Sequence, residues 1–92
     1  MGMKGARIKE KFIQALELPK ELVLNVPKIT ITGKDKILIE NHRNLIRYEK
    51  ECVRLNTSIG MLVLYGSNLT IKEITSEDII VCGKVNKLEF NT

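Results

Sequence analysis

The feature that most constrains the fold is a change of hydrophobic period at Pro19. Before this residue, apolar side chains recur at helical spacing; after it, they alternate at every second residue, which is typical of strands. Nine such runs predict strands, at residues 22–26, 29–32, 36–40, 44–48, 52–56, 61–65, 69–72, 79–82 and 85–90. The sequence therefore predicts a single domain over residues 1–92, with a β-rich body over 22–90.

Turn-forming residues separate nearly every pair of these runs and begin seven to ten residues apart. Gly33-Lys34-Asp35, Gly66-Ser67-Asn68 and Gly83-Lys84 are the clearest examples. This spacing predicts a mainly β fold, a small antiparallel β-meander or sandwich of short strands with one N-terminal helix. A short β-solenoid is the alternative, although its coils require a closer repeat than these runs show.

The segment 6–18 predicts an amphipathic helix that ends before Pro19. Its apolar stripe is Ile8, Phe12, Ala15 and Leu16, and the basic residues beside it are Arg7, Lys9 and Lys11. Such a helix packs on the open face of its own sheet, or it docks on a membrane or a protein partner. The first of these is the favoured interpretation of the pattern.

Net charge argues against a nucleic-acid partner. The chain carries +4 overall, and residues 1–20 hold five Lys and Arg against two Glu, so most of the excess lies in one terminal segment. No apolar run approaches the roughly 20 residues that span a bilayer, and the N-terminus lacks the apolar stretch of a secretory signal. We therefore expect a cytoplasmic protein with reduced cysteines, with peripheral membrane contact left open.

The sequence offers little from which to build a catalytic or cofactor site. His42 is the only histidine, Cys52 and Cys82 lack metal-site spacing, and no glycine-rich phosphate loop is present. We expect no enzyme activity, metal, cofactor or small-molecule substrate. His42 is interpreted as a turn residue that is solvated or bonded to nearby backbone, and the alternative is a small hydrolase that pairs it with a distant carboxylate.

Two further segments are candidate interaction sites. The first is the polar turn Glu40, Asn41, His42 and Arg43, where Asn41 and the following Asn44 alternatively serve only to adopt left-handed backbone geometry. The second is the run Met61–Tyr65, apolar on both faces, which predicts a central strand whose far side is covered by the helix, a second sheet layer or another protomer. Leu62 and Leu64 are its candidate contact residues, and Ile8, Phe12 and Leu16 are the candidate cover.

Several short motifs stand out along the chain: Leu18-Pro19-Lys20-Glu21, Asn25-Val26-Pro27-Lys28-Ile29-Thr30, Ile39-Glu40-Asn41-His42-Arg43, Leu55-Asn56-Thr57 with Gly60, Gly66-Ser67-Asn68-Leu69-Thr70-Ile71-Lys72, and the strand end 79–83. They resemble motifs of the YabP/YqfC family of sporulation proteins, and of its YqfC branch in particular. They occur in order over nearly the whole chain. The resemblance implies an endospore-forming bacterium and a role in the mother cell, in assembly of the spore's outer layers, with no known catalytic activity.

These observations lead to one principal functional expectation and one alternative. We expect a non-enzymatic sporulation protein that acts in spore cortex or coat assembly by protein–protein interaction, with self-association as a corollary. The alternative is a peripheral membrane adaptor anchored by the basic helix of residues 6–18.

Overall fold

The computed structural model describes residues 8, 10–12, 15 and 26–91. Within these residues, six strands form one antiparallel sheet in the order β1-β2-β6-β5-β4-β3. Their bounds are β1 Lys28–Thr32, β2 Lys36–Glu40, β3 Asn44–Glu49, β4 Cys52–Thr57, β5 Gly60–Ile74 and β6 Asp78–Asn91. The mainly β prediction is confirmed, and because every neighbouring pair is antiparallel, the solenoid alternative is wrong.

Two predicted turns are bends inside continuous strands. The sequence predicts separate strands on either side of Gly66-Ser67-Asn68 and of Gly83-Lys84, whereas β5 and β6 run through both segments. The β5–β6 register shifts between Tyr65 and Gly66 and again between Ser67 and Thr70. Such irregularities bend a strand strongly, so each of the two long strands bends near its middle and its second half folds back over the sheet.

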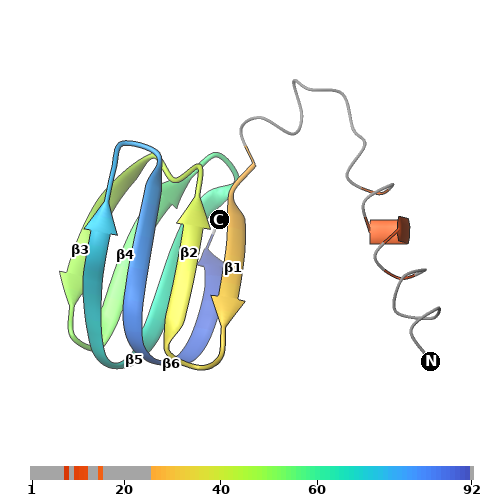
Figure 1. Ribbon diagram of the computed structural model, residues 1–92. Helices are drawn as coiled ribbons and strands as arrows, with labels where there is room; N and C mark the ends of the chain where they lie inside the picture. The colour runs from red at the N-terminus through yellow and green to blue at the C-terminus, as the bar shows by residue number, and fades with distance from the viewer. Residues whose placement is uncertain (1–7, 9, 13–14, 16–25, 92) are drawn as a thin grey trace.

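This bend divides the sheet into two layers, which Figure 1 shows one behind the other. The front layer contains β1, β2, the first half of β6 and the second half of β5; the back layer contains β3, β4 and the remaining halves. Between the layers lies one apolar core, whose fully buried members are Ile37, Ile39, Val53, Leu55, Leu62, Leu64, Leu69, Ile79 and Val81. The sheet stays open, with β1 and β3 as its outermost strands.

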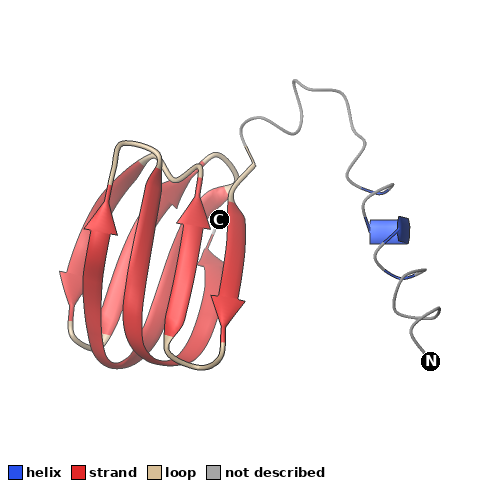
Figure 2. Cartoon of the chain, in the orientation of Figure 1, coloured by secondary structure: helices blue, strands red, loops and turns tan. Residues whose placement is uncertain are grey.

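The strand order departs from a simple meander at one connection. Strands β3 to β6 follow one another as a meander, but β2 pairs with β6 instead of β3. Residues 41–43 therefore cross from the front layer to the back layer, and Figure 2 shows this loop at the upper end of the body. The crossing is fixed at both layers, because the His42 amide donates to Glu77 O at 2.9 Å and the Arg43 amide to Asn56 O at 2.8 Å.

The N-terminal segment is described only in part. Residues 8, 10–12 and 15 are helical, in agreement with the predicted helix over 6–18. Its other residues, including Arg7, Lys9 and Leu16, lie outside the described residues, as does most of the strand predicted at 22–26.

Candidate interaction surfaces

The polar turn after β2 serves first as a structural connection. Asn41 adopts a left-handed backbone with φ 66°, which a short polar side chain tolerates, and its Nδ2 donates to Val26 O at 3.1 Å. Asn44, the other asparagine considered for that geometry, instead begins β3. Glu40 and Asn41 are half-buried and Arg43 is exposed, so a partner can reach these three members of the turn but not His42.

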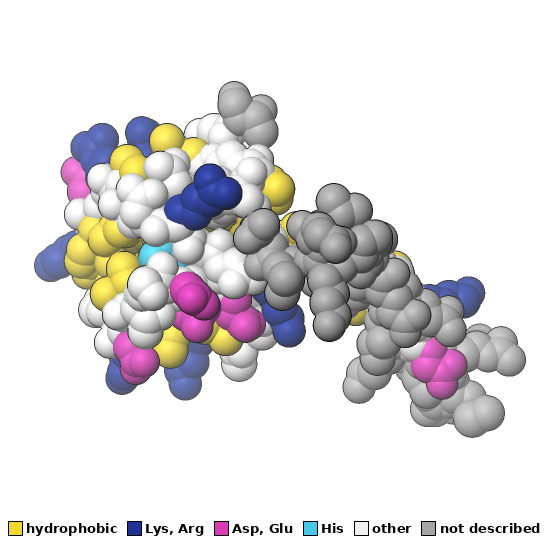
Figure 3. Space-filling model, turned by 90° about the horizontal axis from the view of Figure 1, so that it is seen from above, with side chains coloured by type: hydrophobic (Ala, Val, Ile, Leu, Met, Phe, Trp, Pro, Cys, Tyr) yellow, Lys and Arg dark blue, Asp and Glu magenta, His cyan; other side chains and the backbone are white. Residues whose placement is uncertain are grey.

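His42 closes the upper end of the core between the two layers. Its side chain is 5% exposed, and Figure 3, which looks down on that end, shows it surrounded by other residues. Nε2 lies 3.1 Å from Thr75 O; because a carbonyl oxygen only accepts, Nε2 carries the proton in this bond. Nδ1 is buried and has no hydrogen-bond partner among the described residues, so no carboxylate is placed there to act with it.

We expect the substitution His42→Ala to destabilise the fold. It removes the hydrogen bond to Thr75 O and leaves a cavity above the core. We therefore expect the free energy of unfolding to fall by about 2 kcal/mol. The measurement is urea denaturation followed by circular dichroism. Arg43→Ala, at the exposed neighbouring position, is the matched control and should change stability by less than about 0.5 kcal/mol.

The apolar strand Met61–Tyr65 is central in the sheet, between β4 and β6, as the sequence predicts. Leu62 and Leu64 point into the core and are fully buried. They hold the two layers together and offer no surface to a partner. Interaction through this strand would have to use its outer face.

The outer face of that strand is covered by neighbouring side chains of the same sheet. Val63 lies between Arg54 and Glu89 in register and is fully buried although it faces away from the core. Glu89 accepts a hydrogen bond from Tyr65 Oη at 3.3 Å and pairs with Lys87 Nζ at 3.2 Å. Ile8 and Phe12, two of the three residues predicted to cover this face, are themselves exposed, and the third, Leu16, lies outside the described residues.

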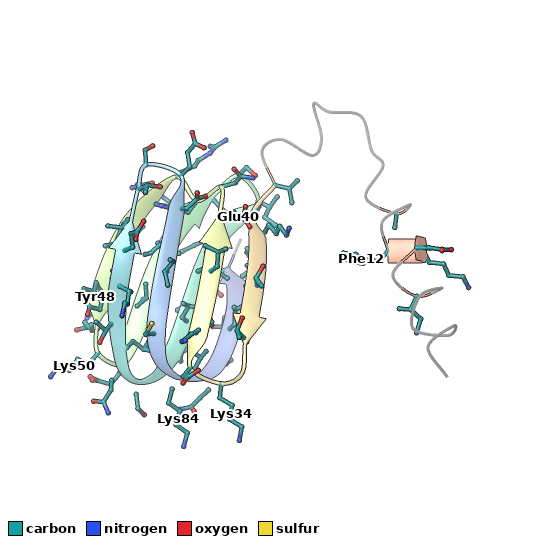
Figure 4. The ribbon with its side chains drawn as sticks, viewed as in Figure 1. Phe12, Lys34, Glu40, Tyr48, Lys50 and Lys84 are labelled. Atoms are coloured by element: carbon teal, nitrogen blue, oxygen red, sulfur yellow. The ribbon has the colours of Figure 1, made fainter. Side chains whose placement is uncertain are left out.

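The candidate helix presents its apolar residues to solvent. Ile8 is 68% exposed and Phe12 is 64% exposed, and Figure 4 shows Phe12 well clear of the sheet. The favoured interpretation, a helix packed on its own sheet, is therefore wrong for the described residues. Glu10 and Lys11 are exposed as well. Two large apolar side chains one helical turn apart remain without a partner in the described part of the chain.

A set of surface residues that the sequence pattern does not single out lies along the free strand edges. Five exposed apolar or aromatic side chains occupy these edges: Ile31 on β1, Ile46 and Tyr48 on β3, Ile74 near the end of β5 and Phe90 near the end of β6. Which strands are edges depends on the strand order, which periodicity does not reveal. One signal was present, because Pro27 immediately before β1 is typical of an edge strand.

Two opposite charges on β3 neutralise each other. Arg47 and Glu49 form an exposed ion pair with Nε and Oε1 3.0 Å apart, and the hydrogen bond that Arg47 donates to this carboxylate raises the pKa of its guanidinium above the usual value. Among the described residues, no group of three or more His, Cys, Asp or Glu side chains is placed to hold a metal ion. Cys52 and Cys82 are free and half-buried. Within the same residues, no helix has the length and apolar character needed to cross a membrane.

Comparison with known proteins agrees with the motifs found in the sequence. The profile described as the YabP family matches residues 24–92, which include the whole sheet. The chain belongs to the YabP family. It is also 34% identical over 90 residues to the uncharacterized protein YqfC of Bacillus subtilis strain 168, a match that covers 98% of this chain and 97% of the relative. No solved structure matches the chain.

Proposed function

We propose that this YabP family protein is a non-enzymatic sporulation protein that acts in the mother cell, in assembly of the spore's outer layers, by binding protein partners along its free strand edges. The observation that carries the proposal is the placement of Ile31, Ile46 and Ile74, which are 58%, 45% and 45% exposed. Each lies on a strand segment that has one side without a strand neighbour among the described residues. A free edge offers unpaired backbone groups to an added strand, and apolar side chains beside it supply specificity.

The edges differ in how they could receive a partner. On β1, four of five residues are exposed, and no charged residue interrupts Ile29-Thr30-Ile31-Thr32. On β3, the pairing with β4 has an irregularity between Leu45 and Arg47, which places Ile46 at a bulge. Bulges and edge charges protect an edge against unwanted pairing, so β1 is the more open of the two.

Charged substitutions at these edges should impair sporulation without unfolding the protein. We expect Ile31→Lys combined with Ile46→Lys, expressed in place of YqfC in Bacillus subtilis, to lower the yield of heat-resistant spores at least tenfold relative to the unsubstituted chain. A lysine on an edge strand opposes strand addition. Protein abundance, measured by immunoblot, should remain the same because both positions are exposed.

The matched control is Ile59→Lys. Ile59 is 48% exposed, which is close to the 45% of Ile46, but it lies in the turn between β4 and β5 and on no strand edge. This control should sporulate normally. Equal spore yields from the edge variant and from the unsubstituted chain would contradict binding through these edges.

A second candidate function, a peripheral membrane adaptor, is favoured by the exposure of Ile8 and Phe12 beside Lys11. A basic amphipathic helix binds anionic membrane surfaces by burying its apolar face and by electrostatic attraction. We expect co-sedimentation with vesicles that contain phosphatidylserine, weakened by salt and by Phe12→Glu. Equal recovery with neutral vesicles would remove the electrostatic part of this function.

A further inference from the structure

A small cleft lies on the outer face of the front layer, near the upper ends of β2, β5 and β6. It is lined by Leu38, Glu73, Thr75, Asp78, Ile79 and Ile80 and is called the acidic cleft below. Leu38 and Ile80 face each other in register and are only half-buried, so the cleft has an apolar floor. Its volume of about 130 Å³ is close to the roughly 150 Å³ of a cavity that holds benzene. One aromatic ring or one aliphatic side chain fits there.

Carboxylates surround this apolar floor. Glu73 and Asp78 line the cleft, Glu40 is the register partner of Asp78, and Glu77 precedes Asp78 in the chain. None of the four forms an ion pair with a described residue, and neither does Lys28, which lies opposite Glu40 on β1. Figure 3 shows Asp and Glu side chains with apolar side chains between them on one side of the body, and Lys and Arg side chains close by. A ligand for this surface must therefore combine an apolar group with positive charge.

The chain itself carries a segment with that chemistry. Ile8 and Phe12 form an exposed apolar pair with Lys11 beside it, and residues 1–20 carry a net charge of +3, from five basic and two acidic side chains. The ring of Phe12 has the size that the acidic cleft accepts. Burial of the phenylalanine side chain favours association, and the charge complementarity directs the approach of the two surfaces.

We propose that the acidic cleft of one copy of the protein receives Phe12 of the N-terminal helix of a second copy. A helix folded onto its own sheet would bury Ile8 and Phe12, whereas both are exposed in this structure and Phe12 stands away from the body (Figure 4). The point at which the N-terminal segment joins the sheet is also fixed, because Asn41 Nδ2 donates a hydrogen bond to Val26 O. Helix and cleft are different surfaces, so two copies can exchange helices reciprocally or associate head to tail.

Mixing two variants of the full chain tests this contact. Phe12→Glu leaves the cleft intact and disables the helix; Glu73→Lys with Asp78→Lys leaves the helix intact and disables the cleft. We expect each variant alone to be monomeric by light scattering, with self-association weakened roughly tenfold or more relative to the unsubstituted chain. An equimolar mixture should form a one-to-one dimer, since one working helix and one working cleft remain.

The control is Asp35→Lys with Glu51→Lys, which adds the same charge in the turns at the opposite end of the body and should associate like the unsubstituted chain. Circular dichroism checks the fold of each variant, and exposed Glu73→Lys alone replaces the double substitution if that unfolds. A mixture that stays monomeric, or a cleft variant that still self-associates, overturns the proposal. The contact lies on the sheet face, so it goes beyond the proposed edge function, and Ile31→Lys with Ile46→Lys should leave the mixed dimer intact.

Discussion

We expect Gly66→Ala, a change of a single methyl group, to destabilise this protein strongly. A Cβ at Gly66 would collide with the backbone carbonyl oxygen of Lys84 and come within 3.0 Å of Leu69 Cδ2. Gly66 lies where β5 bends between the layers, and its amide donates to Glu51 O at 3.1 Å. The chain cannot move away from Lys84 without disturbing the β5–β6 pairing that joins the two layers.

The expected loss of stability is about 3 kcal/mol or more, the upper end of what overpacking costs, because the colliding atom belongs to the backbone. A domain of this size has only about 5–14 kcal/mol in total, so the variant should unfold at a much lower urea concentration, or fail to fold. Gly33→Ala is the matched control. Gly33 has a positive φ of 63°, but the nearest atom to its added Cβ is Asp35 Oδ1 at 3.5 Å, so only the roughly 1–2 kcal/mol of left-handed strain applies. Equal midpoints for the two variants would contradict the collision at the bend.

The bend of β5 at Gly66 also shows which parts of this fold can be predicted from the sequence. Alternation places β2 and β4 accurately, since Ile37, Ile39, Val53 and Leu55 all face the core. The glycines at 66 and 83 predict turns, because a turn and a strand bend both use glycine where a side chain would collide. Only the contacts with Lys84 and Asn68, which come from distant parts of the chain, distinguish the two cases.

The candidate surfaces were predicted less well, for a related reason. His42 is polar and lies in a polar turn, yet the crossing from β2 to β3 places it over the core, where its ring is nearly inaccessible. The edge residues and the acidic cleft depend on strand order: Leu38 and Ile80 meet only because β2 pairs with β6. Residues 38 and 80 are too far apart in the chain for local pattern to indicate this pairing, although the helix and its apolar stripe are evident from sequence.

The substitution Leu64→Ala should decide whether the apolar strand of β5 is core or contact surface. Leu64 is fully buried among the side chains of both layers, so truncation removes apolar burial and leaves a cavity. We expect the free energy of unfolding to fall by about 2–5 kcal/mol, measured by urea denaturation. Ile46→Ala, at an edge residue that is 45% exposed, should cost less than about 0.5 kcal/mol.

Binding measurements on the same two variants should give the opposite order. Leu64→Ala is studied without urea, at a temperature where it is folded. It should bind partners like the unsubstituted chain because Leu64 has no exposed surface. Ile46→Ala should weaken binding along the β3 edge while it leaves stability unchanged. If Leu64→Ala instead kept its stability and lost binding, Leu64 would have to be reachable by a partner, and the two layers would have to separate for the protein to act.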